Sequence, residues 1–404
     1  MRVLVIGAGG VGEAAVKIAA RSKAFSAICV ADVDEVKAKA AAAAAAGGVE
    51  VTAARVDASS IDSIKGLASA FKPDAILNAC DPRFVEAIFD ASFEVGCTYL
   101  DMAMSLSKPN ADEPYAKTGV MLGYYQFAKA SEWEAKGLLA LVGIGVEPGL
   151  SDIFAAYAHK HLFSRIDEVG VRDGANLTVE GYGFAPTFSI WTTIEECLNP
   201  PLIYEKDKGW YVTEPFSGGE IFDFPEGIGP LECVNVEHEE VALIPRWIDA
   251  GLVTFKYGLG DEFIDVLKTL HKLGLDSTKP IEVGNVRVAP RDVVAAALPD
   301  PARLGPLMKG KTCAGTLVRG LSKEGSPRAV YLYHVVDNSE TMAEWGSQAV
   351  VWQTAINPVV ALELLASGTW SGVGVLGPEA FDPDPFMEAL VAHGSPYGIR
   401  EEQA

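Results

Sequence analysis

A short apolar strand followed by a glycine-rich turn, at the very start of the chain, most restricts the possible fold. The run Val3-Leu4-Val5-Ile6 leads directly into Gly7-Ala8-Gly9-Gly10-Val11-Gly12. Gly7 allows a tight turn, Gly9 lets the backbone approach a pyrophosphate, and Gly12 lets the next helix pack close to its strand. The helix N-terminus then faces the anion. This pattern predicts a dinucleotide-binding domain.

A second apolar strand completes the pattern and bears on the choice of dinucleotide. The run Ala27-Ile28-Cys29-Val30 is soon followed by Asp32, twenty residues after Gly12. A carboxylate here accepts a hydrogen bond from a ribose 2′-hydroxyl and repels a 2′-phosphate, so NAD is favoured. Lys37 or Lys39 could reach a phosphate, which keeps NADP open. The alternative is a glycine turn that binds no dinucleotide.

Strand and helix signals alternate through the first third of the chain. Strand patterns cover 49–56, 75–78, 98–101 and 139–143, with helical patterns between them. This order predicts an α/β fold with a doubly wound parallel sheet of the Rossmann type, which binds its ligand at the carboxyl ends of the strands. The cofactor contacts expected there, besides those above, are Asp57, Ala58, Asn78, Ala79 and Cys80.

The pattern changes after residue 151. An apolar helical segment at 153–162 leads into alternating strand patterns, among them 311–318 and 328–336. We therefore expect a second, α+β domain with a mixed or antiparallel sheet over 151–344, for substrate binding and dimerisation. Residues 1–150, completed by 345–404, are expected to form the Rossmann domain.

The acidic composition limits the classes of partner. The formal net charge is −21 over 404 residues, which argues against nucleic acid and against anionic membrane surfaces but suits a cationic substrate. No apolar stretch reaches the length expected of a membrane helix, and the N-terminal strand is unlike a signal peptide. The six cysteines are scattered without a CxxC motif. These features predict a reduced, cytoplasmic protein without structural zinc.

A likeness to one enzyme family rests on segments spread over nearly the full chain: Gly145–Gly149, Phe154–Phe163, His238–Glu240, Leu298–Pro301, Leu304–Pro306, Lys309–Thr312, Ala343–Ala349 and Phe381–Met387. They resemble the saccharopine dehydrogenase-like family and, within it, the carboxynorspermidine and carboxyspermidine dehydrogenases. Two segments depart from that branch. Asp32 stands where it carries Ser-Arg, and Asn176–Gly181 stands where it carries a Gly-Gly-Asp-His-like stretch.

The resemblance implies an NAD(P)-dependent oxidoreductase acting on CH–NH bonds. Such an enzyme condenses an amino-acid semialdehyde with an amine and reduces the imine, or runs in reverse. It also implies a homodimer. A saccharopine or lysine dehydrogenase is the alternative within this class, and a non-catalytic NAD(P)-binding regulator is the alternative outside it.

Four residues are candidates for the chemistry. The resemblance places the family's acid at Glu147, which could instead cap the helix at Ser151. Asp101 ends a strand and could face the pocket, or it could bond to a loop. His238 suits proton transfer and Glu239 would raise its pKa, although this segment could also be a solvated charged face.

Cationic side chains are needed to anchor amino-acid carboxylates. Arg172, Arg246 and Lys256 are the candidates, since guanidinium and ammonium groups bind carboxylates, and each could equally form a surface salt bridge. His159 and His161 lie two residues apart on a helix and point to different faces. We therefore expect no metal site.

Overall fold

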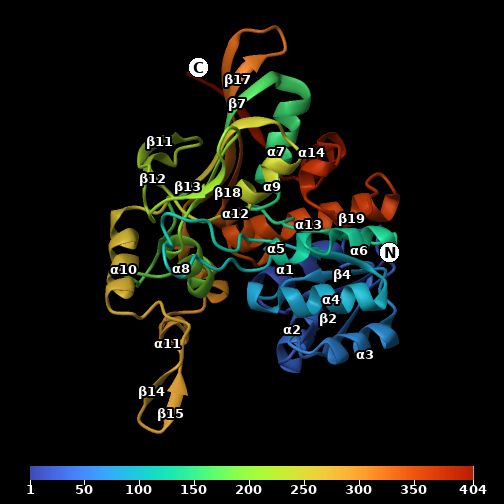
Figure 1. The fold of residues 1–404 in the computed structure, drawn as a ribbon. Coiled ribbons are helices and arrows are strands. Elements are labelled where there is room, and N and C mark those ends of the chain that lie inside the picture. The colour runs from blue at the N-terminus through green and yellow to red at the C-terminus, as the bar shows by residue number, and fades with distance from the viewer. Residues whose placement is uncertain (404) are drawn as a thin grey trace.

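The computed structural model describes residues 1–403, and its first sheet has seven parallel strands. Their order across the sheet is β19-β6-β5-β4-β1-β2-β3, so the strand order reverses beside β1. Figure 1 labels β2, β4 and β19 of this sheet. The strands are β1 (Arg2–Ile6), β2 (Ala27–Asp32), β3 (Glu50–Arg55), β4 (Ala75–Asn78), β5 (Thr98–Asp101), β6 (Leu139–Leu141) and β19 (Gly374–Leu376). This arrangement confirms the predicted doubly wound α/β fold.

Helices cover both faces of this sheet. Those that follow its strands in the first part of the chain are α1 (Gly10–Ala19), α2 (Glu35–Ala44), α3 (Ile61–Phe71), the short 3₁₀ helix η1 (Pro82–Phe84), α4 (Val85–Val95), α5 (Tyr124–Phe127) and α6 (Ala130–Ala135). Apart from the edge strand β3, the strands are mostly buried, which explains why they are continuous apolar runs.

The helix α13 (Ala349–Ser367) corrects one expectation from the sequence. By length and composition alone it could cross a membrane, with a mean hydropathy of 1.5. However, 78% of that apolar stretch is buried inside the protein, where the helix packs against α1, α12 (Asn338–Trp345) and α14 (Pro383–Ala392). Its apolar surface is therefore accounted for by the protein core.

The second sheet has nine strands and is mixed, as predicted. Most neighbours are antiparallel, while β13 and β7 run parallel to each other. The strands are β7 (Phe163–Ala175), β9 (Leu202–Glu205), β10 (Gly209–Val212), β11 (Glu220–Phe224), β12 (Gly229–Asn235), β13 (Ala250–Gly258), β17 (Lys311–Ser322), β18 (Pro327–Asp337) and β20 (Gly398–Glu402).

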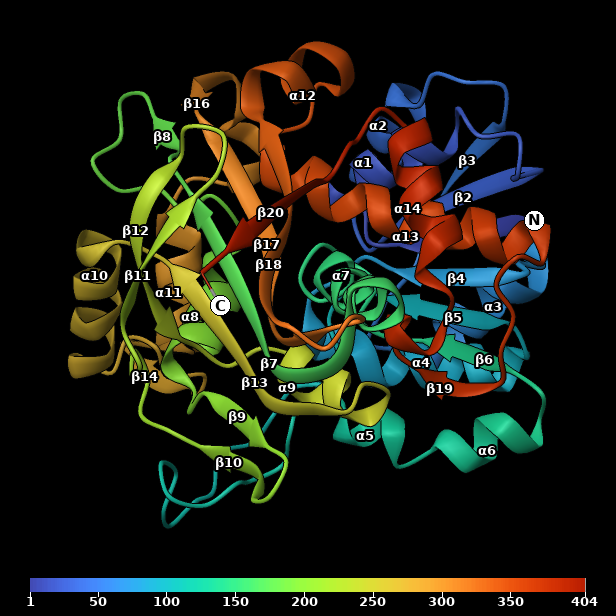
Figure 2. The same cartoon turned by 90° about the horizontal axis from the view of Figure 1, so that it is seen from above.

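The two sheets are joined by the buried helix α7 (Leu150–Tyr157), which lies between them in Figure 2. One hydrophobic core runs through both halves, so the sheets share a packed seam. The remaining elements of the second half are α8 (Ile190–Leu198), α9 (Glu240–Leu243), α10 (Asp261–Lys272), α11 (Pro290–Ala297), the hairpin of β14 (Ile281–Val283) and β15 (Val286–Val288), and the pair β8 (Thr178–Val179) and β16 (Met308–Lys309).

Candidate active site

A cavity of about 780 Å³ lies where the carboxyl ends of the first sheet meet the second sheet. The turns after β1, β4, β5 and β6 contribute to it from one side. Strands β7, β13 and β17, with helices α8 and α11, contribute from the other. In parallel sheets, ligands bind at the carboxyl ends of the strands where the strand order reverses, so this is the expected position of an active site.

The glycines of the first turn serve two purposes: some are required for close packing, and one leaves space for a ligand. Gly7 has a φ of +106°, and a Cβ there would lie 2.5 Å from the carbonyl oxygen of Ala79. A Cβ on Gly12 would collide with the carbonyl oxygen of Gly7. Gly9, in contrast, has no atom within 4 Å of its Cβ position and lines the cavity. With an uncapped N-terminus of α1 beside it, this open space fits a dinucleotide pyrophosphate.

The predicted cofactor contacts separate into two groups. Six of them line the cavity: Gly9, Gly10, Val11, Asn78, Ala79 and Cys80. Burial raises the pKa of the Cys80 thiol to about 12, so it packs as a thiol rather than acting as a nucleophile. Asp32, Asp57 and Ala58 lie outside the cavity, at the ends of β2 and β3. The Asp32 carboxylate accepts the Ala8 and Asp34 N–H groups at 2.9 Å, which fixes it beside the glycine turn.

Two half-buried carboxyl groups meet on the cavity wall. Glu147 follows β6 and Asp173 lies on β7, and each is hydrogen-bonded to the other. Burial, reinforced by the charge of Asp173, raises the pKa of Glu147 well above its usual range. Burial also raises the pKa of Asp173 to about 6, although Glu147 and Tyr257 act to lower it. A pair of this kind holds one proton between two oxygens at neutral pH.

His238 is buried beside these acids. Its ring stacks on Phe255 with 3.8 Å between ring centroids, and the predicted alternative of a solvated face is wrong. The acid partner is Glu240, at 2.5 Å from Nδ1, whereas Glu239 lies at 3.5 Å and accepts the Met104 N–H. Burial lowers the pKa of His238, but the charge and hydrogen bond of Glu240 outweigh it and the pKa rises to about 10.

This segment also groups donors that could ligate a metal ion. The donor atoms of His238, Glu239 and Glu240 lie within 4.8 Å of one another. The Nδ1 atom of His238 is already hydrogen-bonded to Glu240, and a second oxygen of Glu240 accepts from Ser151 at 2.8 Å. The grouping is therefore satisfied as an acid–histidine couple, and our prediction of no metal stays a prediction.

Sequence reasoning missed three groups that line the cavity. Asp173 and Tyr257 lie on neighbouring strands, and Glu196 lies on α8. Burial and the nearby acids raise the pKa of Glu196 to about 8, against the opposing charge of His238. Only the position of Asp173, at the end of a predicted strand, could have pointed to one of them.

Asp101 is not brought to the cavity. It is buried at the end of β5, where it accepts hydrogen bonds from the Tyr99 hydroxyl at 2.9 Å, the Gln126 amide at 2.6 Å and the Gly143 N–H at 2.7 Å. The structure therefore favours the alternative of a bond to a loop, and these contacts hold the turn after β6 in place.

None of the three predicted carboxylate anchors reaches the cavity. Arg172 and Lys256 both form ion pairs with Glu220. Arg246 stacks on Phe127 at 3.8 Å. Among the described residues, the lining contains no lysine and no arginine. Arg172 and Lys256 instead form an ion-pair cluster of the second sheet, and Arg246 contacts α5 of the first half.

Replacing Arg172 by methionine is expected to lower the free energy of unfolding by about 1–3 kcal/mol, because Glu220 loses its hydrogen-bonded guanidinium and keeps only the ion pair with Lys256. Arg172 is 1% exposed. The KM of the folded variant for the amino-acid semialdehyde, which carries the carboxylate, should stay unchanged. Denaturant titration and steady-state kinetics check both. Lys256→Met, at the edge of the same cluster, is the matched control, and it should lower the free energy of unfolding by less than Arg172→Met does. A large rise in KM with unchanged stability would restore Arg172 as an anchor.

Comparison with known proteins places this geometry in a family. The Saccharopine dehydrogenase NADP binding domain matches residues 3–141, and the Saccharopine dehydrogenase C-terminal domain matches residues 145–395. The chain belongs to the saccharopine dehydrogenase family. This membership confirms the prediction of an NAD(P)-dependent oxidoreductase that acts on CH–NH bonds.

Members of the family with assigned names are similar over nearly their whole length. Carboxynorspermidine synthase of Vibrio alginolyticus is 30% identical over 99% of this chain and 97% of its own. Carboxyaminopropylagmatine dehydrogenase of Synechocystis sp. is 29% identical over 98% of this chain and 96% of its own. Apo saccharopine dehydrogenase (L-Glu forming) from Saccharomyces cerevisiae shares the fold, with a TM-score of 0.69 and 13% identity over 100% of both chains.

Proposed function

We propose that this protein condenses an amino-acid semialdehyde with a diamine or a related polycationic amine and reduces the imine with NAD(P)H. The charge of the cavity supports this choice. Six carboxyl groups line it: Asp81, Glu147, Asp173, Glu196, Glu239 and Asp300. Those of the six that are ionised attract a multiply charged amine and repel additional carboxylates. The curated relatives are named for products of this kind, carboxynorspermidine and carboxyaminopropylagmatine.

The same charge disfavours the alternative substrates. Saccharopine joins two amino acids and carries several carboxylates, which need cationic anchors when buried. The described lining offers none, and Arg172, Arg246 and Lys256 lie elsewhere. A saccharopine dehydrogenase therefore fits this cavity less well than a polyamine-forming enzyme.

The reaction takes up one hydride and one proton for each imine that is reduced, and water leaves from the carbinolamine. The dinucleotide, held by Gly9, Gly10 and the turn after β4, would supply the hydride. Glu147, which holds a proton, is placed to protonate the departing hydroxyl. The Asp173 carboxylate stabilises the iminium cation left behind. His238, oriented by Glu240, is the second proton donor on the cavity wall.

The oxidation of NADH by the purified protein tests this proposal. Aspartate semialdehyde should support turnover with diaminopropane, putrescine or agmatine, whereas 2-oxoglutarate with lysine should not. Absorbance of NADH is the measurement. Turnover confined to the lysine mixture would contradict the polyamine assignment. No turnover with any pair, despite tight binding of NADH, would favour the non-catalytic alternative.

The affinity for the amine is expected to depend on the ionisation of Glu196. Its pKa is raised to about 8, mainly by burial, and only the carboxylate attracts a cation. The amine KM should therefore fall as the pH rises from about 6 to about 8, while the amine stays protonated. In Glu196→Gln the KM should be higher and lose this slope. A slope that persists in the variant would assign it to another group.

We propose NAD as the preferred cofactor, although NADP stays possible. The Asp32 carboxylate ends β2 and is held by the Ala8 and Asp34 N–H groups, so its charge is fixed where a 2′-phosphate would lie. The ratio of kcat/KM for NADH and NADPH checks this preference. A ratio that favours NADPH would contradict it.

We also propose that the protein is a cytoplasmic homodimer. Each chain would divide into domains at residues 150 and 344 as the sequence suggests, with the correction that β20 pairs with β18 and so belongs to the second domain. The hairpin of β14 and β15 projects from the rest of the chain (Figure 1), and exposes Ile281, Val283 and Val286 by more than half. A two-stranded hairpin is marginally stable alone in water, so it benefits from cover by a second copy. Light scattering that finds a stable monomer would contradict the dimer.

A further inference from the structure

Two guanidinium groups stack on one tryptophan of the cavity wall. The Cζ atom of Arg83 lies 4.4 Å from the ring centroid of Trp191, and that of Arg291 lies 4.7 Å from it. The indole N–H donates to Asp292 at 3.2 Å. Trp191 is 7% exposed and lines the cavity. Its position therefore depends on charged groups from outside its own helix.

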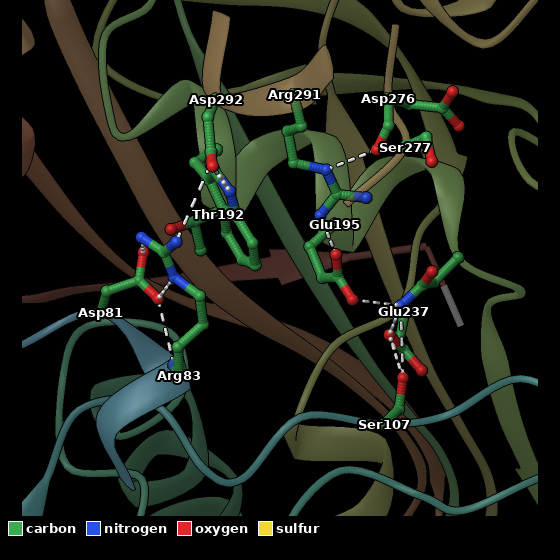
Figure 3. Close-up of polar contacts among 12 residues, drawn as sticks. Asp81, Arg83, Ser107, Thr192, Glu195, Glu237, Asp276, Ser277, Arg291 and Asp292 are labelled. Atoms are coloured by element: carbon green, nitrogen blue, oxygen red, sulfur yellow. Dashed lines mark hydrogen bonds and ion pairs between the residues drawn. The ribbon is translucent and has the colours of Figure 1, made fainter. Parts of the chain in front are cut away.

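Arg83 comes from the dinucleotide half of the protein. It lies on η1, directly after the turn at residues 78–82, which lines the cavity at the end of β4. Its guanidinium binds the Asp81 carboxylate through Nε at 2.8 Å and through Nη2 at 3.3 Å, as Figure 3 shows. A two-pronged contact of this kind fixes the plane of the guanidinium. Any restraint on the turn after β4 is thereby passed to Arg83.

Helix α8 receives this contact on the substrate side. It carries Trp191 and, five residues later, Glu196, and both line the cavity. Glu195 forms an ion pair with Arg291 of α11 (Figure 3). Asp292 completes the link, because it lies 3.9 Å from Nη1 of Arg83. The dinucleotide-facing turn and the helix that carries Glu196 are thus joined through Arg83.

We propose that Arg83 is a positioning residue that couples dinucleotide binding to the placement of α8, and through it to the binding of the amine. This inference rests on the proposed function, because it assigns Glu196 to the amine. A dinucleotide beside Asp81 restrains the turn, and the Arg83–Trp191 stack passes that restraint to the helix. The amine is then bound best after the dinucleotide.

Hydrogen–deuterium exchange of the whole protein tests the coupling without any need for turnover. In the wild type, saturating NADH should slow amide exchange about tenfold both in the glycine turn and in residues 190–198. In Arg83→Gln, protection of the glycine turn should persist while protection of residues 190–198 is lost. Arg83 is 45% exposed, so the substitution spares the core.

Control variants separate stacking from charge. Arg83→Lys keeps the charge but not the planar group, so it should lose the coupling as the glutamine variant does. Arg287→Gln, on the exposed strand β15, should behave as wild type. In steady-state kinetics, Arg83→Gln should raise the amine KM about tenfold while kcat and the Kd for NADH change less than about twofold.

Several outcomes overturn the inference. If NADH still protected residues 190–198 in Arg83→Gln, the coupling between the dinucleotide and α8 would not run through Arg83. An α8 that is unprotected in the wild type, while the glycine turn is protected, would show that no coupling exists. If NADH protected neither segment, the proposed function itself would fail, and this outcome is distinct from the first two.

Discussion

Replacing Glu147 by glutamine is expected to lower kcat about 10³-fold while leaving the affinity for NADH unchanged. Glutamine keeps the size of the side chain and its hydrogen bond to Asp173, but it has no acidic proton to give to a departing hydroxyl. Loss of a positioned proton donor typically costs 10²- to 10⁴-fold in rate. Steady-state kinetics and calorimetric titration with NADH measure the two quantities.

The stability of the same variant provides an independent check. Burial raises the pKa of Glu147 well above 4.5 in the folded protein. A carboxyl group of this kind costs stability as the pH rises above its unfolded pKa, since the folded state resists its ionisation. The glutamine variant should therefore gain stability relative to wild type as the pH rises above about 4.5. A variant that loses both activity and stability at pH 8 would argue for a structural role.

Asp101 is the matched control for Glu147, because both acids lie at the carboxyl ends of strands of the first sheet, but Asp101 is buried outside the cavity. Asp101→Asn disturbs three hydrogen bonds outside the cavity. It should lower the melting temperature, and it should lower the kcat of the folded enzyme far less than Glu147→Gln does, through the turn after β6. If Asp101→Asn removed activity and Glu147→Gln did not, the proposed roles of the two acids would be reversed.

Alanine at Gly9 should abolish tight binding of the dinucleotide without affecting the fold. Gly9 has φ −71° and ψ −174°, a backbone that alanine adopts freely, and nothing lies within 4 Å of its Cβ position. The added methyl group projects into the space that fits the pyrophosphate. We expect a loss of affinity for NADH of about 100-fold, or about 2.7 kcal/mol, in a protein of normal melting temperature.

Alanine at Gly12, in contrast to alanine at Gly9, should lower the stability of the protein. Its methyl group would collide with the carbonyl oxygen of Gly7, and both groups belong to the packed turn between β1 and α1. Overpacking at such a site costs roughly 3 kcal/mol or more of unfolding free energy. Calorimetry and thermal unfolding separate the two variants. Equal losses of stability in both would show that Gly9 serves packing rather than the cofactor.

The structure also shows why sequence reasoning found only part of the cavity. The residues after β1 and β4 were predicted because they follow strands of a parallel sheet, where position along the chain fixes position in space, and Glu147 because the family resemblance places an acid there. Two other acids of the cavity lie elsewhere: Asp173 on β7 and Glu196 on α8. Local pattern carries no information on which distant strand faces the first sheet.

Charged residues were the least predictable from sequence. His238 and its neighbours could equally have been solvated, and their burial beside Phe255 comes from the packing of β13. Arg172 was a plausible anchor for a substrate carboxylate, but in the structure its partner is Glu220 of the second sheet. The charge on a side chain does not reveal whether its partner is a substrate or another residue of the same protein.

The sequence by itself determined the Rossmann half, its glycine turn and the family, because these depend on short-range periodicity and on backbone positions that only glycine tolerates. Tertiary structure alone decided which ionisable groups surround the cavity and which stabilise the fold. Those roles depend on burial and on contacts between residues far apart in the chain, which raise the pKa of Glu147 and leave Asp101 outside the cavity.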